Sequence, residues 1–204
     1  MDMADYLKEI QHAATSVISL VWADHREFEK VQQKLDTLKR KTQHGYQQAQ
    51  NLANDEDEDP ALATGAYWDT YFCPDKRRFH ADKQRDKLEN LLQLRDFSRN
   101  ALASSILQFA KQGISIVHGE LKNAPAGRII HGINLKEIIW QGRNQALHWE
   151  EGKLRKPVVD CFEKLKNSDS SFADYNKRCL AFAVVQTLGW TEWNAFKKDM
   201  LSLR

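Results

Sequence analysis

An arginine and a histidine lie close together in a helix-forming segment, and their side chains offer the chemistry of phosphodiester cleavage. Arg143 is followed directly by Asn144, and His148 comes after four intervening residues. Arginine keeps a planar charge that can hold a phosphate through two hydrogen bonds, and histidine can move protons near neutral pH. Cleavage without a metal needs both functions. We therefore take Arg143, Asn144 and His148 as the candidate catalytic residues.

Helical geometry constrains how these three side chains can meet. At about 100° per residue, Asn144 and His148 lie on one face a turn apart, whereas Arg143 and His148 are about 140° apart around the axis. Asn144 can therefore steady the imidazole. Arg143 needs its long side chain, a local departure near Gly142, or a second copy of the helix across a two-fold axis to act beside His148. The last of these predicts a homodimer.

The sequence from Arg143-Asn144 to His148 resembles the signature of the HEPN superfamily, in which an arginine and a polar residue precede a histidine at this spacing. The resemblance implies a helical bundle, usually dimeric, with the metal-independent endoribonuclease activity common among toxins, phage-defence proteins and RNA-processing factors. His148 would act as general base or acid, and Arg143 would stabilise charge on the phosphate. Asn144 would orient these groups or add a hydrogen bond. Attack by an internal 2′-hydroxyl would leave 2′,3′-cyclic phosphate and 5′-hydroxyl ends, with no cofactor and no metal.

The same resemblance implies an antitoxin or a defence-system partner protein. One residue departs from the pattern of some HEPN toxins, which carry a tyrosine two positions after the histidine as a target for silencing. Here that position is Glu150. Glu150 and Glu151 would also weaken RNA binding unless they point away from the site or pair with nearby cations.

Basic residues in two parts of the chain are candidates for RNA binding. Lys153, Arg155 and Lys156 follow the motif directly, and Arg77 and Arg78 lie in the most basic stretch of the chain. From residue 121 to the end there are 14 Lys plus Arg against 9 Asp plus Glu, a surplus of 5 that suits a phosphate backbone. A solvated helix face with paired acids explains the stretch around Arg77 equally well.

Two alternatives to a nuclease remain open from the sequence. A HEPN-like helical module could bind RNA or protein without turnover, with His148 an ordinary surface histidine and Arg143 paired with a surface acid. A helical adaptor is the other alternative, in which a long N-terminal helix drives oligomerisation and the motif is accidental.

Composition favours one all-α domain. The chain has 204 residues, 42% of them hydrophobic, with only nine glycines and four prolines and a net charge of +2. Three widely spaced cysteines, Cys73, Cys161 and Cys179, argue against a disulfide framework or thiolate metal site and favour a reducing cytoplasm. We expect no signal peptide, because the N-terminus lacks a basic flank and a small-residue cleavage site. We expect no membrane span, because no apolar run is long enough.

Apolar periodicity and helix breakers predict the organisation of the domain. We expect a long helical arm over 1–53, an acidic loop over 54–62 that carries Asp55 to Asp59 and Pro60, and a helical bundle over 63–204 that holds the motif. Within this HEPN-like bundle, we predict a short aromatic helix that ends in a turn at Cys73-Pro74, and longer helices over 81–111, 135–150, 154–166, 172–188 and from Thr191 onward.

Overall fold

The computed structural model describes the backbone of residues 1–53 and 60–204, and the side chains of residues 1–40, 43 and 82–204. The described chain divides into two compact units. One comprises Met1–His25 with Phe97–Arg204 and is called the motif unit below; the other, Arg26–Asp96, is called the hairpin unit. Each is considered by itself.

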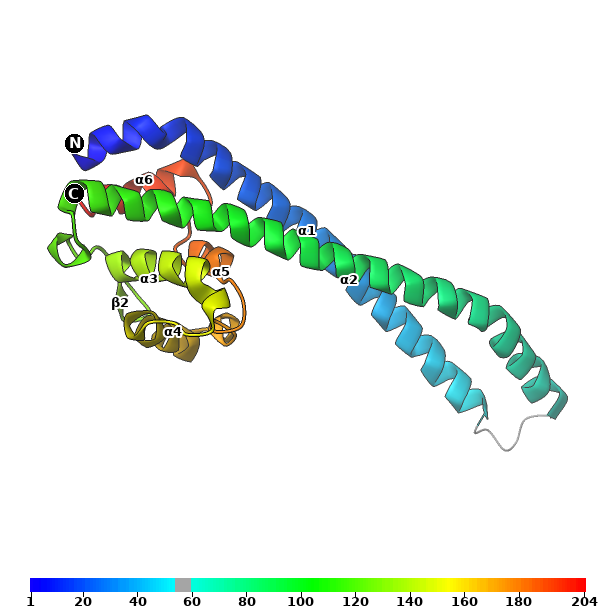
Figure 1. The fold of residues 1–204 in the computed structure, drawn as a ribbon. Helices are drawn as coiled ribbons and strands as arrows, with labels where there is room; N and C mark the ends of the chain where they lie inside the picture. The colour runs from blue at the N-terminus through cyan, green and yellow to red at the C-terminus, as the bar shows by residue number, and fades with distance from the viewer. Residues whose placement is uncertain (54–59) are drawn as a thin grey trace. The chain divides into compact units, whose positions relative to one another are not determined.

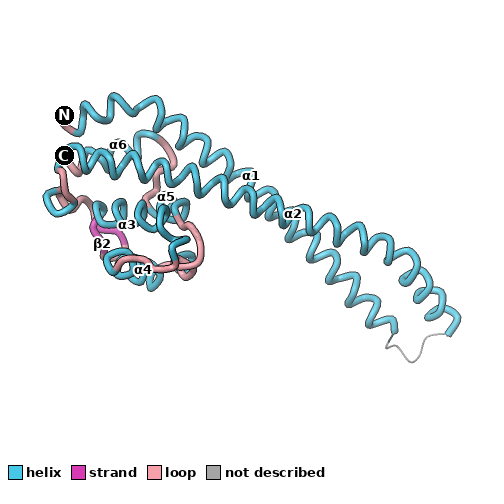
Figure 2. Tube along the Cα trace, in the orientation of Figure 1, coloured by secondary structure: helices cyan, strands magenta, loops and turns pink. Residues whose placement is uncertain are grey.

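The protein is all-α, as the sequence predicts. Figure 1 and Figure 2 show the order of the elements along the chain. They are α1 (Met3–Ala53), α2 (Pro60–His118), η1 (Leu121–Asn123), β1 (Ile129–Ile130), β2 (Ile133–Asn134), α3 (Leu135–His148), η2 (Trp149–Glu151), α4 (Lys156–Ser168), η3 (Ser170–Phe172), α5 (Ala181–Thr187) and α6 (Trp193–Leu201).

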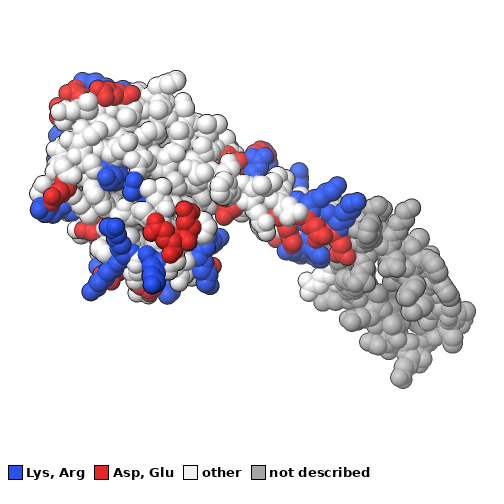
Figure 3. Space-filling model, viewed as in Figure 1, with Lys and Arg blue, Asp and Glu red and all other residues white. Residues whose placement is uncertain are grey.

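The hairpin unit is formed by the adjoining parts of α1 and α2. Val31 and Leu35 of α1 are buried one turn apart, as apolar residues at this spacing should be when a helix packs on its neighbour. Nζ of Lys39 on α1 lies 3.0 Å from Oε1 of Glu89 on α2, so an ion pair links the two helices. Figure 3 shows acidic and basic side chains mixed over the described part of this unit. The charge there is therefore balanced locally and gives no extended basic surface on the face in view.

The core of the motif unit is a continuous apolar cluster to which every helix of the unit contributes. Trp190, Phe162, Phe172 and Phe196 are its largest fully buried side chains. The helices approach closely at Gly113 of α2, where a Cβ atom would lie 2.8 Å from the Tyr6 ring and 2.9 Å from the Met200 methyl group. A larger residue at this point would force α1, α2 and α6 apart.

A buried polar network anchors the last helix. The carboxylate of Asp199 on α6 accepts two hydrogen bonds from the Arg128 guanidinium at 2.8 Å each, and a third from the Trp190 indole at 2.8 Å. Arg128 also donates to the Leu188 carbonyl oxygen at 2.6 Å. Such a bidentate arginine pair fixes orientation as well as distance. It joins the segment before β1 to α6 and to Leu188, the residue that follows α5.

A short antiparallel hairpin leads into the motif helix. Ile130 pairs with Ile133 across a two-residue turn of His131 and Gly132, which have φ values of 49° and 74°. Two successive positive φ angles are typical of a type I′ turn, which suits the twist of a two-residue hairpin. The sequence did not predict this hairpin, which sets the point at which α3 begins.

Near the start of α2, two predicted elements differ from the structure. No turn interrupts α2 at Cys73-Pro74, because a proline removes a single backbone hydrogen bond and this helix of 59 residues continues through it. α2 also begins at Pro60, inside the predicted loop 54–62, and proline suits the first helical position. Residues 54–59 of that loop, with its acidic run, lie outside the described part of the chain.

The predicted helix over 172–188 is helical only at Ala181–Thr187. The side chain of Gln145 bonds to backbone groups of Tyr175, Arg178 and Leu180 and so holds the preceding residues outside a helix. The predicted helical arm over 1–53 and the predicted helices over 135–150, 154–166 and after Thr191 are confirmed within a few residues by α1, α3, α4 and α6. Among the described residues, no helix is both long enough and apolar enough to cross a membrane.

Candidate active site

α3 carries the candidate catalytic residues, and its buried face fixes their position. Leu135, Ile138, Ile139 and Gly142 face the core. A Cβ atom on Gly142 would lie 2.9 Å from Cγ1 of Val184, so this glycine lets α3 lie close against α5 directly before Arg143. The close packing leaves little freedom for the backbone from which Arg143 projects.

Gln145 holds the same helix through hydrogen bonds rather than apolar packing. Gln145 follows Asn144 in α3, and its side chain is fully buried. The amide nitrogen donates to the carbonyl oxygens of Tyr175 and Arg178, each at 2.7 Å, and the amide oxygen accepts from the Leu180 backbone N–H at 3.0 Å. Because every polar atom of the amide is used, the burial carries little desolvation cost.

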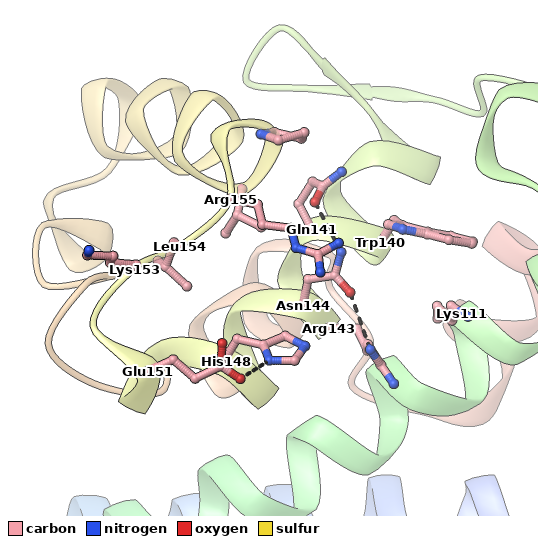
Figure 4. Close-up of a pocket in the computed structure, with 12 residues that line it drawn as sticks. Lys111, Trp140, Gln141, Arg143, Asn144, His148, Glu151, Lys153, Leu154 and Arg155 are labelled. Carbon is pink, nitrogen blue, oxygen red and sulfur yellow. Dashed lines mark hydrogen bonds and ion pairs between the residues drawn. The ribbon is translucent and has the colours of Figure 1, made fainter.

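The exposed face of α3 lines a pocket of about 520 Å³ that contains Arg143, Asn144 and His148 together. The predicted catalytic residues therefore meet in one cavity of one chain (Figure 4). The other lining residues come from α2, α3, η2, the segment before α4 and the first turn of α4. They are Lys111, Trp140, Gln141, Glu151, Lys153, Leu154, Arg155, Pro157 and Val158. The angular separation of Arg143 and His148 around the helix does not require a second copy for both to line one cavity.

Arg143 is half-buried and held by neutral acceptors. Its Nε donates to Oε1 of Gln108 on α2 at 2.8 Å, and its Nη1 lies 3.3 Å from Oδ1 of Asn144. Asn144 in turn donates to Oε1 of Gln141 at 3.3 Å. These amides orient the guanidinium without neutralising it, so its charge and remaining N–H groups stay available to an anion.

His148 is the last residue of α3, and its imidazole is held by Glu151. The Nδ1 atom lies 2.6 Å from Oε1 of Glu151, which the 3₁₀ turn η2 brings back toward the helix end. Gly152 follows with a φ of 70°, a conformation that favours glycine and ends this turn. A carboxylate can only accept, so the proton of a neutral His148 lies on Nδ1 and its Nε2 is the atom with a free lone pair.

The pocket carries more positive than negative charge. Lys111, Arg143, Lys153 and Arg155 line it, and within the described chain no carboxylate lies within ion-pair distance of any of the four. Glu151 is the acid among the lining residues, and it is engaged by His148. Lys111 places its ammonium 4.6 Å from the ring centroid of Trp140. A concave surface with unpaired cations concentrates anions.

Only some of the predicted RNA-binding residues line the pocket. Lys153 and Arg155 line it, and in Figure 4 Arg155 extends toward Asn144 whereas Lys153 points away from the cluster. Lys156 instead lines a neighbouring cavity together with Lys164 and the acids Glu137 and Asp160. Arg77 and Arg78 lie on α2 where side chains are outside the described part of the chain.

The chain matches no protein-family model, no curated protein and no solved structure. The geometry of the pocket is therefore what indicates a function.

Five residues of the site were missed by sequence reasoning. Gln141 and Trp140 share a helix with the motif, and Trp140 precedes Asn144 by one turn, a spacing that would have marked it as a neighbour. Glu151 was recognised only as a source of repulsion. Gln108 and Lys111 come from α2, more than thirty residues earlier, and no pattern in the sequence connects them to α3.

Among the residues that the structure describes, no three His, Cys, Asp or Glu side chains come together in a group that could hold a metal ion. Cys161 is buried, and burial raises the pKa of its thiol to about 12. A thiol in that environment stays protonated at neutral pH and is a poor nucleophile.

Proposed function

We propose that this chain is a HEPN-like, metal-independent endoribonuclease whose active site is the pocket around Arg143 and His148. The observation that carries the proposal is that one pocket joins a histidine with a free Nε2 to four cations that have no carboxylate partner among the described residues. Phosphodiester cleavage by an internal nucleophile needs a base for the hydroxyl and fixed positive charge for the phosphate.

The proposed reaction starts with His148. Its Nε2 takes the proton of the ribose 2′-hydroxyl, and the resulting oxyanion forms a bond to phosphorus while the bond from phosphorus to the 5′-oxygen breaks. The 5′-oxygen takes a proton from water, and His148 later returns its proton to solvent, so no net proton is consumed. The products are a 2′,3′-cyclic phosphate and a 5′-hydroxyl, and DNA is inert because it lacks the nucleophile.

The fixed groups around His148 have distinct roles in this scheme. Arg143 donates its unused N–H groups to the phosphate oxygens as negative charge develops on them. Asn144 and Gln108 act as positioning residues, because they hold the Arg143 side chain. Glu151 stabilises the imidazolium form that follows proton uptake, as a carboxylate beside a general base does.

Cleavage of a mixed structured RNA pool in EDTA tests the proposal. Wild-type protein should yield fragments with cyclic phosphate ends, which mass spectrometry of the products identifies. His148→Ala and Arg143→Ala should yield none. His12→Ala is the matched control, because His12 is an exposed helical histidine that does not line the pocket. Equal cleavage by wild type and His148→Ala would reject the assignment and indicate a contaminating nuclease.

A non-catalytic RNA-binding module is the second candidate, and one observation favours it. The His148 side chain is 48% exposed and that of Glu151 is 58% exposed, so water surrounds the proposed base. Many active sites exclude solvent, whereas an open site of this kind can bind anions through its cations with water present. Binding of RNA by wild type without any cleavage in the same assay would support this candidate.

The homodimer expected from the sequence stays a prediction. Both motif residues line the pocket of a single chain, so dimerisation would serve to widen the RNA-binding surface rather than to bring Arg143 to His148. Light scattering during size-exclusion chromatography measures the mass in solution. A mass near 23.6 kDa would contradict the dimer, and twice that value would support it.

A further inference from the structure

Trp140 is placed in the pocket as a ligand-binding side chain would be. It is half-buried on α3, three residues before Arg143 and one helical turn before Asn144, and it lines the same cavity. Its indole N–H makes no hydrogen bond within the described part of the chain and is not among the buried polar atoms that lack a partner, so it stays accessible to water or to a ligand. A half-buried aromatic ring with an accessible donor is therefore part of the cavity lining.

Two other tryptophans of the motif unit show what a structural role looks like. The indole of Trp22 donates to the Trp190 carbonyl oxygen at 2.8 Å, and the indole of Trp190 donates to Asp199 at 2.8 Å. Trp190 is fully buried. Both rings therefore pack with their polar atom satisfied. Trp140, Trp149 and Trp193 make no such bond within the described chain, and of these three Trp140 alone lines the pocket.

A charged side chain lies over the Trp140 ring, which also packs against the apolar core. The Lys111 ammonium lies 4.6 Å from the ring centroid and, within the described chain, has no acidic partner. A cation on a partly exposed ring contributes a factor of about 2 to 5 in an equilibrium. A nucleobase stacked on an aromatic ring contributes about 5- to 150-fold in affinity. A base can therefore replace the ammonium on the ring.

We propose that Trp140 and Lys111 form a nucleotide subsite in which the indole stacks a nucleobase and the displaced ammonium binds the adjacent phosphate. The inference rests on the proposed ribonuclease function and specifies its substrate as RNA with an unpaired nucleotide beside the cleaved bond. In an A-form duplex the base faces are already stacked, and the deep major groove excludes side chains. Duplex RNA should therefore bind the pocket less well than a single strand.

Binding without cleavage tests the subsite. In a His148→Ala background, fluorescence anisotropy compares an oligoadenylate of about eight nucleotides with a ribose-phosphate chain of equal length that lacks bases. The oligoadenylate should bind about 5- to 150-fold more tightly. Trp140→Leu should abolish this ratio, and Trp140→Phe, which keeps a smaller ring, should retain part of it. Lys111→Ala should weaken binding of both chains while leaving a base preference.

Trp193→Leu is the matched control, because Trp193 is half-buried against Phe196 on α6 and does not line the pocket. It should keep the ratio found for the parent. Equal binding of the two chains, or a ratio that survives in Trp140→Leu, would overturn the subsite while leaving the nuclease proposal intact. Absence of binding by either chain at low salt, together with absence of cleavage by wild type, would overturn both.

Discussion

The Nδ1 atom of His148 lies 2.6 Å from Oε1 of Glu151, three residues along the chain. This contact assigns the imidazole proton to Nδ1 and leaves Nε2 as the atom that exchanges protons with a ligand. The glutamate that reads in the sequence as a repulsive neighbour of a phosphate site therefore orients the proposed base. The contact forms because α3 ends at His148 and the chain continues into a tighter turn.

Glu151→Ala should release the His148 ring and shift its proton toward Nε2. We expect a fall of about 5-fold or less in kcat, because exposed pairs contribute at most about 1 kcal/mol. Nitrogen-15 NMR of the histidine ring reports the tautomer directly. Glu150→Ala is the control, because Glu150 is exposed and does not line the pocket. An unchanged tautomer in Glu151→Ala would contradict the assignment.

Gln108→Glu should weaken RNA binding by about 5-fold or more while leaving the fold intact. A carboxylate in place of the amide keeps an acceptor for Arg143 Nε, but it neutralises the charge that the phosphate needs. Thermal unfolding should show an unchanged or higher Tm, since a new ion pair forms. Gln112→Glu adds the same charge at an exposed position of α2 outside the pocket. Similar losses of RNA affinity in both variants would indicate only a general charge effect.

The slope of log K for RNA binding against log salt should report how many cations of the pocket bind phosphates. If Lys111, Arg143, Lys153 and Arg155 all bind phosphates of a single strand, log K should fall with log salt with a slope of up to about −2.8. Each alanine substitution among the four should reduce the slope by about 0.7. Lys156→Ala, in the neighbouring cavity, should leave it unchanged. A larger effect of Lys156 than of Arg155 would place the RNA elsewhere.

Asp199→Ala should destabilise the motif unit by about 2–3 kcal/mol. It leaves the Trp190 indole and the Arg128 guanidinium without their acceptor. The cost is less than the roughly 3–5 kcal/mol of a fully buried pair, since the Arg128 side chain is 46% exposed although that of Asp199 is only 8% exposed. Urea unfolding followed by circular dichroism measures the loss. Asp174→Ala, at an exposed ion pair with Lys177, should leave the urea midpoint nearly unchanged.

Gly142→Ala should test whether the contact of α3 with α5 positions Arg143. The added methyl group would meet Val184 at 2.9 Å, which predicts a loss of about 1–3 kcal/mol in stability and reduced cleavage. Val184→Ala makes room for the methyl group. The double variant should therefore be more stable than the sum of the two single losses implies, by about 0.5–3 kcal/mol. Simple additivity would show that α3 moves to accommodate the methyl group without contacting Val184.

The sequence by itself determined the all-α class, the positions of α1, α3, α4 and α6, and the three residues of the motif. Apolar spacing along α1 and α3 and the choice of helix-forming residues act within a few turns, so they can be read from one chain. The 3₁₀ turn after His148 and the irregular segment before α5 were not predicted. Both depend on hydrogen bonds, at Glu151 and at Gln145, that compete with the helical pattern.

Only the tertiary structure decided what surrounds the motif. Gln108 and Lys111 belong to α2, and packing of that helix on α3 brings them to Arg143 and Trp140. Packing also left Lys156 outside the pocket that holds Arg155, its neighbour in sequence. The physical reason is that helical periodicity specifies which face of a helix is buried, whereas the partner that covers the face follows from the shapes of all helices together.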